Sequence, residues 1–278
     1  MKKILVSTDF SANSKSGVRF AIRWASEQKV NLVFIHVLNV LKATSWSGAY
    51  FEKYAAQQEV LCRSKLEKFV AGIYNSMNTK PGKHSFEIIQ GISADISILD
   101  YCRKNHGIDY ICISTRGAGK FNKIFGTNTG NLITKSAVPV MAVPKNYRVA
   151  QVKSVMYAAD LRNYPEEIQR VVDFAQPFKA NIDVLHFTWP DEITIDKKIM
   201  ETAAGKKYKY GMKVHLEKND AVHSLIQNIQ SQIQIRKPSV VVMFTNQKRT
   251  FFQRLFLSSK AEELSFEAKV PLLVFNKN

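Results

Sequence analysis

The sequence has few cysteines, and none stands in a metal-binding or disulfide pattern. Cys62, Cys102 and Cys112 all lie in the first half, and no two have the CxxC spacing typical of zinc sites. No apolar run approaches the roughly 18 residues that a membrane span needs. The apolar stretch that follows Met1 is too short for the hydrophobic part of a secretion signal. We therefore expect a soluble, cytoplasmic protein with reduced thiols.

Acidic residues are also scarce. The chain has 23 Asp and Glu against 40 Lys and Arg, a formal net charge of +17. Residues 1–150 hold 21 basic and 9 acidic residues, net +12, which leaves 19 and 14, net +5, for the remainder. Such a field attracts nucleic acid, anionic lipid or phosphorylated ligands, and it does so more strongly in the first half.

An internal repeat divides the 278 residues into two similar parts. Residues 3–10, KILVSTDF, match residues 154–161, SVMYAADL, and the AVPV around Pro139 matches the KVPL around Pro271. Hydrophobic residues make up 45% of the chain, enough for a core in each part. The repeat predicts domains over residues 1–146 and 152–278, joined by a polar segment near 145–153.

Each part contains five short apolar runs separated by segments of helical periodicity. Runs without polar alternation indicate strands buried on both faces of a parallel sheet, and alternation with helices indicates βαβ units. One helical segment, residues 18–25, follows the candidate caps Ser11, Asn13 and Ser14. We predict an α/β fold with two tandem, doubly wound, five-stranded parallel-sheet domains of Rossmann-like type. The predicted strands are 3–8, 32–38, 84–89, 109–114 and 139–143, then 153–158, 182–187, 212–217, 239–244 and 271–275.

The first part carries roughly 20 extra residues between its second and third strands. They include four aromatic residues, Trp46, Tyr50, Phe51 and Tyr54. Two interpretations are open: a longer second helix whose aromatic residues pack on their own domain, or a lid over a ligand crevice.

Polar residues and glycines follow the first and fourth strands, at the edge where open parallel sheets bind ligands. Ser7, Thr8 and Asp9 end the first strand, STRGAGK at 114–120 follows the fourth, and GTNT at 126–129 opens the last helix. Glycines allow backbone N–H groups to approach phosphate, and a helix N-terminus adds unpaired N–H groups. The loop is either a phosphate cradle or a structural turn. It does not have the spacing of a P-loop.

Taken together, these motifs resemble the universal stress protein family in its tandem form, over nearly the whole chain. The resemblance implies a fold like that of the adenine nucleotide alpha hydrolases in each half. It also implies an ATP or AMP site, with Mg²⁺ accompanying ATP, in the branch that has the phosphate motif G-x2-G-x9-G-[S/T]. This sequence departs from the motif twice, because Ser114 replaces the first glycine and the longer spacing is one residue short.

The resemblance assigns residues to that site by position. Asp9 would lie beside adenine, Val37 would contact the base, and Gly117, Gly126 and Thr127 would contribute to the phosphate motif, with positive charge supplied nearby by Lys120 and Lys123. The full set of implied nucleotide-binding residues is Ser7, Thr8, Asp9, Val37, Ser114, Arg116, Gly117, Gly119, Gly126, Thr127 and Asn128.

The second copy has lost the motif glycines. Matched by spacing, Thr245, Lys248 and the pair Ser258 and Ser259 stand in their places, although Asp160 still corresponds to Asp9. Each replacement puts a Cβ where the backbone would approach phosphate, so we expect the second domain not to bind ATP in the family manner.

Two further patterns have structural readings. His36 and His186 occupy equivalent strand ends, and a position repeated in both copies indicates architecture before catalysis. The stretch KKYKY at 206–210 has the interleaved basic and aromatic residues that meet RNA or phosphoinositide, although a solvated helix end is the commoner meaning.

The sequence leads to one functional hypothesis and two alternatives. The first is a cytoplasmic stress-response binding protein whose first domain holds ATP or AMP, with at most weak, incidental ATPase activity and no catalytic or metal-ligating residues. Its second domain would be structural, pairing its last strand with that of the first domain in an intramolecular pseudo-dimer, and homodimerisation stays open. One alternative is an adaptor that binds no nucleotide and uses its basic surface against acidic protein, lipid or nucleic acid. The other is a related-fold enzyme, but the Ser-Gly-Gly-x-Asp-Ser loop of such enzymes is absent.

Overall fold

Two compact α/β units make up the computed structural model, one from residues before 150 and the other mostly from residues after it. The structure describes residues 1–115, 127–148, 150–161, 164–188, 196–219, 223, 225–246 and 270–277. Among these residues, no helix has the length and apolar character needed to cross a bilayer.

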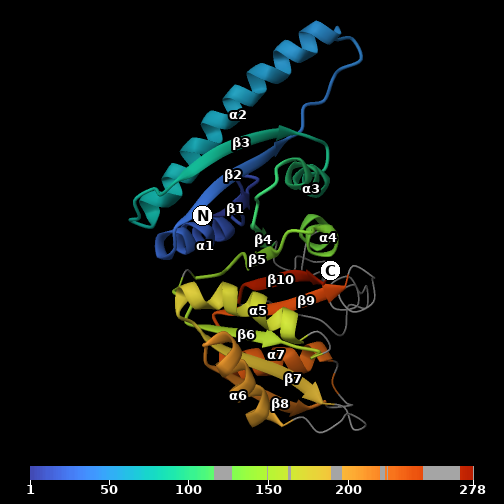
Figure 1. Cartoon of the computed structure of the whole chain (residues 1–278). Helices are drawn as coiled ribbons and strands as arrows, with labels where there is room; N and C mark the ends of the chain where they lie inside the picture. Colours follow the sequence, from blue (N-terminus) through green and yellow to red (C-terminus); the bar gives the residue numbers. More distant parts are fainter. Residues whose placement is uncertain are drawn as a thin grey trace. The chain divides into compact units, whose positions relative to one another are not determined.

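The first unit is a five-stranded parallel sheet with helices on both faces (Figure 1). Helices α1 and α2 contact one another and cover one face, while α3 and α4 contact one another on the other face. The strand order is β3-β2-β1-β4-β5, so the direction of winding reverses between β1 and β4. Its elements are β1 (Lys2–Ser7), α1 (Lys15–Glu27), β2 (Val30–Leu38), α2 (Gly48–Ser76), β3 (His84–Gln90), α3 (Ala94–Lys104), β4 (Tyr110–Thr115), α4 (Thr127–Lys135) and β5 (Val140–Pro144).

The second unit repeats this architecture, with parallel strands in the order β10-β9-β6-β7-β8. The strand order again reverses beside the first strand of the unit. Its elements are β6 (Ser154–Ala158), α5 (Tyr164–Ala175), the 3-10 turn η1 (Gln176–Phe178), β7 (Asn181–Thr188), α6 (Lys197–Tyr208), β8 (Met212–Lys218), α7 (Leu225–Arg236), β9 (Val240–Asn246) and β10 (Leu272–Lys277).

Burial explains why the strands could be predicted from the sequence. Ile4, Leu5 and Val6 are fully buried, as are Val155 and Met156 at the matching places, because helices cover both faces of each sheet. All ten predicted strands are present within about two residues of their predicted ends, and the predicted tandem doubly wound fold is confirmed.

The extra residues of the first unit lie in a longer second helix. Helix α2 has 29 residues, whereas its counterpart α6 has 12. Trp46, just before α2, packs edge-on against Tyr50 and Tyr54, with ring centroids 5.1 and 4.9 Å apart. None of these aromatic residues lines the pocket described below, and the ring contacts of Trp46 are with α2 itself, so the insertion forms a longer helix.

The turn after the first strand has the same conformation in both units. Phe10 has φ 62° and Leu161 has φ 59°, the left-handed region that side chains other than glycine rarely adopt. In each unit the histidine at the end of the second strand hydrogen-bonds through Nδ1 to a carbonyl of this turn: His36 to Thr8, at 2.8 Å, and His186 to Ala159, at 3.0 Å. The architectural interpretation of the two histidines is confirmed.

Strand register defines which residues of the two units are equivalent. Val6 on β1 pairs with Cys112 on β4, and Tyr157 on β6 pairs with Val242 on β9. Because Val6 and Tyr157 correspond in the repeat, Cys112 corresponds to Val242.

This register corrects one position of the expected motif. Two residues further along, Ser114 corresponds to Phe244, so the expectation that Thr245 replaces it is wrong by one residue. Spacing between polar residues suggested Thr245, whereas backbone pairing fixes the strands. The other expected replacements, Lys248, Ser258 and Ser259, lie outside the described residues.

Candidate ligand-binding site

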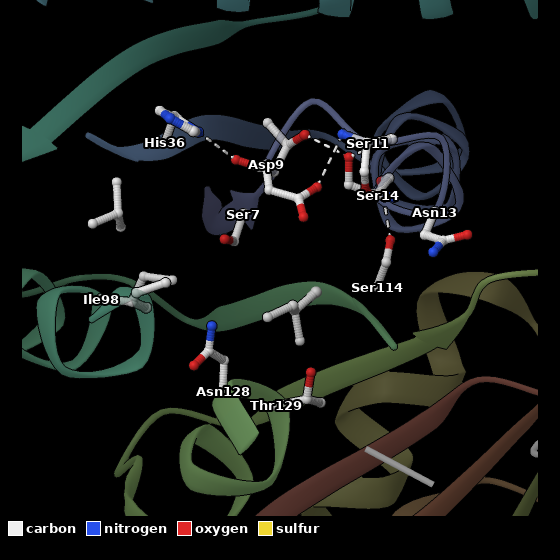
Figure 2. A pocket seen from close by; sticks show the side chains of 14 residues that line it. Ser7, Asp9, Ser11, Asn13, Ser14, His36, Ile98, Ser114, Asn128 and Thr129 are labelled. Carbon is white, nitrogen blue, oxygen red and sulfur yellow. Dashed lines mark hydrogen bonds between the residues drawn. The ribbon is translucent and has the colours of Figure 1, made fainter. Parts of the chain in front are cut away.

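A pocket opens in the first unit where the strand order reverses, at the carboxyl ends of β1 and β4 (Figure 2). This is the edge where open parallel sheets bind ligands. The pocket encloses about 140 Å³. We call it the strand-end pocket; it is lined by Ser7, Thr8, Asp9, Ser11, Asn13, Ser14, His36, Val37, Ala94, Ile98, Ile113, Ser114, Asn128 and Thr129.

The turn after β1 presents a carboxylate to the pocket. The buried hydroxyl of Thr8 accepts a hydrogen bond from Phe10 N–H at 3.1 Å, which holds the turn in its left-handed conformation. Asp9 is exposed, and one of its oxygens accepts a hydrogen bond from Ser11 N–H at 3.0 Å. In Figure 2 the carboxylate points from the turn into the pocket. The carboxylate is therefore placed to meet a ligand.

An apolar wall faces these polar groups. Val37 comes from β2, and Ile98, fully buried, comes from α3. A Cβ added to Gly91, at the end of β3, would lie 2.0 Å from Ser97 Oγ and 3.5 Å from Val37 Cγ1. Glycine at this position thus allows α3 to approach the strand ends and complete the wall.

The start of α4 lies on another side of the pocket. Asn128 is exposed and Thr129 is buried, and both line the pocket. The buried carboxylate of Asp95, at the start of α3, accepts hydrogen bonds from Ser93 and from Asn131 of α4, the latter at 2.7 Å. Burial alone would raise the pKa of Asp95, but these hydrogen bonds outweigh it and hold the pKa below its ordinary value. The ionised carboxylate thereby fixes α4 against α3.

The ring of His36 lies in a half-buried position above the turn. Because a carbonyl oxygen only accepts hydrogen bonds, Nδ1 of His36 must donate to Thr8. Burial is the main cause that lowers the pKa of His36; the bond to Thr8 and the charge of Asp9 oppose it, and Lys65 adds to it. The imidazole is consequently neutral at physiological pH.

The pocket brings together six of the predicted site residues: Ser7, Thr8, Asp9, Val37, Ser114 and Asn128. Arg116, Gly117, Gly119 and Gly126 lie outside the described residues, as do Lys120, Lys123 and the side chain of Thr127.

Sequence reasoning missed other lining residues. Ser11, Asn13 and Ser14 stand out in the sequence only as helix caps, although capping residues of a helix that follows the first strand naturally lie at the ligand edge. Thr129 belongs to the stretch at 126–129 but was not assigned to the site, and Ala94, Ile98 and Ile113 have no distinguishing signal, because apolar side chains are common in any helix or strand.

At the place of Ser114, the second unit has packed side chains. Phe244, at the place of Ser114, stacks on Phe275 with ring centroids 5.0 Å apart and meets Tyr157 edge-on at 5.5 Å. The guanidinium of Arg170 lies 4.5 Å from the centroid of Phe275. The hydroxyl of Tyr157 donates to the buried Glu167 of α5. These residues form a core where the first unit has hydroxyl groups.

The basic and aromatic stretch at 206–210 belongs to a helix end. Tyr208, the last residue of α6, donates to the Pro165 carbonyl at 2.8 Å, and Tyr210 donates to the Ala180 carbonyl at 2.7 Å. Both hydroxyls are bound within their own unit, which favours the helix-end interpretation.

Neither metal ligation nor thiol reactivity is evident in the part of the chain that the structure describes. No group of three His, Cys, Asp or Glu side chains there could hold a metal ion. Burial raises the pKa of the Cys102 thiol to about 11 and raises those of Cys62 and Cys112 as well. The three thiols therefore stay protonated at neutral pH.

Comparisons with known proteins place this pocket in a familiar fold. The model of the universal stress protein family matches residues 1–144. A universal stress protein from Archaeoglobus fulgidus DSM 4304 is 17% identical, with a TM-score of 0.74 and coverage of 99% of this chain and 98% of that one. A functionally unknown protein from Pseudomonas aeruginosa PAO1 is 14% identical, with a TM-score of 0.59 and coverage of 99% and 92%. A comparison with curated protein sequences gave no match. The two structures share the fold along the full length, and the family model identifies the first half: the chain belongs to the universal stress protein family.

Proposed function

We propose that the first unit binds an adenine nucleotide, ATP or AMP, in the strand-end pocket. On this proposal the chain is a cytoplasmic binding protein of the stress response, and its second unit has a structural role. The observation that carries the proposal is the position of the pocket, which opens where the strand order reverses and combines an apolar wall, an exposed carboxylate and a helix start.

The two sides of the pocket suit the two ends of a nucleotide. Val37 and Ile98 offer an apolar surface for a base, and Asp9 offers a carboxylate oxygen that can accept a hydrogen bond from an amino or hydroxyl group. Across the pocket, α4 begins at Thr127, and the first N–H groups of a helix lack partners within it. Such a helix start favours phosphate. The described residues thus fit a nucleotide, and Mg²⁺ accompanying ATP would be held mainly by the phosphates.

We propose binding without efficient turnover. One oxygen of Asp9 is engaged by Ser11 N–H, and the Nδ1 proton of His36 is committed to Thr8. A general base needs a lone pair within hydrogen-bond reach of the attacking water, in an orientation fixed by a third group. Neutral His36 keeps a lone pair on Nε2, but the described lining of the pocket contains no Lys or Arg that could stabilise charge on a transferred phosphoryl group, so we propose that ATP hydrolysis is slow and incidental.

A nucleotide assay tests the proposal. The protein is purified without added nucleotide and denatured, and the supernatant is assayed for adenine nucleotides; titration calorimetry with ATP and AMP follows. We expect one nucleotide per chain and loss of binding in Asp9→Ala and in Gly126→Asp, which adds negative charge to the phosphate motif. Asp160→Ala is the matched control, because it changes the equivalent turn of the second unit.

Three outcomes would contradict parts of the proposal. Absence of bound nucleotide, together with no thermal shift in millimolar ATP, would favour the adaptor alternative. Two nucleotides per chain would contradict the structural role of the second unit. Equal loss of binding in Asp9→Ala and Asp160→Ala would remove the assignment to the strand-end pocket.

A further inference from the structure

Ser114 caps a helix that is distant in the sequence. Its hydroxyl accepts a hydrogen bond from Gly17 N–H at 2.7 Å and donates to the Ser14 carbonyl at 3.0 Å, and the Ser16 hydroxyl lies 3.1 Å away. All three partners belong to the start of α1. Ser14, at the N-cap of α1, has no side-chain capping bond of its own. The penultimate residue of β4 therefore supplies the cap that the helix itself lacks.

This contact depends on a glycine in α1. A Cβ added to Gly17 would lie 2.7 Å from Ser114 Oγ and 3.0 Å from Ser114 N. A helix and a strand that approach this closely hold the last residues of β4 in one position. The second unit lacks this hydroxyl cap, because Phe244 stands at the place of Ser114.

The hydroxyl contacts continue from α1 to the turn that carries Asp9. Ser14 Oγ lies 2.8 Å from Thr8 Oγ1, and Thr8 Oγ1 accepts the N–H of Phe10. Thr8 and Ser14 are both buried. Through Ser14, whose carbonyl bonds Ser114 and whose hydroxyl contacts Thr8, the end of β4 is thus linked with the turn after β1.

We propose that Ser114 is a positioning residue of the nucleotide site. Its hydroxyl fixes the point where the chain leaves β4 toward the phosphate motif, and Ser14 and Thr8 tie that point to the turn that presents Asp9. The inference rests on the proposed nucleotide binding. It assigns a role to Ser114, which stands where the motif has its first glycine: its hydroxyl anchors the end of β4 on α1.

The test compares nucleotide affinity with stability. Ser114→Ala removes the anchor, and we expect the Kd for AMP and for ATP to rise about tenfold, the effect of losing interactions worth one hydrogen bond of ordinary strength. Val18→Ala is the control, since it truncates a buried apolar side chain of α1, removes no hydroxyl group and lowers stability at least as much. Calorimetry is performed at a temperature where circular dichroism finds every variant folded.

A double-variant cycle tests the connection itself. Thr8→Val keeps the side-chain shape but removes the other end of the linked hydroxyls, so we expect it to weaken binding too. Because both substitutions break the same linkage, the double variant should bind nucleotide with the affinity of whichever single variant binds it less tightly. If Ser114→Ala does not fold, Thr8→Val alone must show the loss.

The outcomes separate this inference from the function on which it rests. Weaker binding in Ser114→Ala with parental binding in Val18→Ala supports a positioning role. Parental affinity in Ser114→Ala, equal losses in Ser114→Ala and Val18→Ala, or losses that multiply in the double variant would overturn the inference and leave nucleotide binding intact. Absence of binding in the parent would overturn both.

Discussion

The imidazole of His36 stacks on the phenyl ring of Phe10, with ring centroids 4.2 Å apart and 28° between the ring planes. Lys65 of α2 lies over the same phenyl ring, 4.6 Å from its centroid, and Phe69 meets it edge-on. Phe10 has a left-handed backbone conformation that costs an L-residue roughly 1–2 kcal/mol. The ring contacts offset this cost and keep the turn that presents Asp9 in one conformation.

Substitution of Phe10 separates backbone strain from ring contacts. Phe10→Ala loses the contacts and keeps the strain, whereas Phe10→Gly loses the contacts but adopts positive φ freely. We expect Phe10→Gly to be the more stable of the two by about 1 kcal/mol, measured by urea denaturation. Leu161→Gly and Leu161→Ala should follow the same order, since Leu161 has the same φ. In the helix α2, Tyr50→Gly should instead be less stable than Tyr50→Ala by about the same amount. If glycine and alanine ranked in the same order of stability at Phe10, Leu161 and Tyr50, the strain argument would be contradicted.

Two glycine-to-alanine substitutions in helices should have opposite signs. Gly17→Ala places a methyl group against Ser114, with backbone and side-chain atoms 2.7 to 3.2 Å away, and should destabilise by about 1–3 kcal/mol. Gly72→Ala meets no atom within 4 Å and should stabilise by roughly 0.5–1 kcal/mol, the ordinary preference of a helix for alanine. Denaturation midpoints give both values. A stabilised Gly17→Ala variant would show that α1 can move away from β4.

Removal of the Asp95 carboxylate should loosen α4. Asp95→Asn replaces one accepting oxygen by a donor, so either Ser93 or Asn131 loses its bond, at a cost of about 1–3 kcal/mol at neutral pH. Asp100→Asn is the control, because its exposed ion pair with Arg103 contributes about 0–1 kcal/mol.

The pH dependence of the Asp95 effect has a definite sign. The folded-state pKa lies below the ordinary 3.8, so the stabilisation is present above pH 3.8 and is lost as the pH falls through the folded pKa. The stability difference between the parent and Asp95→Asn should therefore shrink at low pH. A difference that is constant from pH 7 to pH 3 would contradict an ionised Asp95.

His36 should make the first unit sensitive to mild acid. Its folded-state pKa is lowered, so the unfolded state binds more protons, and stability is complete above the ordinary value of 6.5 and declines below it. His36→Gln should flatten this decline, whereas His106→Gln, at an exposed position, should leave it unchanged. Melting temperatures from pH 7.5 to 5.5 check the prediction. The same slope in the parent and in His36→Gln would exclude His36 as the titrating group.

The fold could be predicted because apolar runs in the sequence indicate where the buried strands lie. Apolar runs such as Ile4 to Val6 contain no polar residue, which happens when both faces of a strand are covered. The equivalence of Ser114 and Phe244 was not predictable, because it depends on hydrogen bonds between strands that are distant in the sequence.

The site was predictable only in outline. Asp9 and Asn128 were found because polar groups at strand and helix ends are exposed to a ligand edge. The engagement of Ser114 by α1 and of Asp95 by α4 has no sequence signal, since each bond joins elements more than 30 residues apart. Phe10 gave no signal either, because left-handed turns usually carry glycine or asparagine.

Helix α2 has a further consequence for amide hydrogen exchange. Its 29 residues span about 43 Å, yet its first buried residue is Ala55, and its beginning runs clear of the strands in Figure 1. The first amides of α2 lack carbonyl partners within the helix, and those up to Tyr54 precede its first buried residue, while amides near Leu66 and Val70 also share the protection of the sheet. Exchange rates along this one helix should therefore fall steadily from its first turn to its middle, a gradient that the 12-residue α6 is too short to develop.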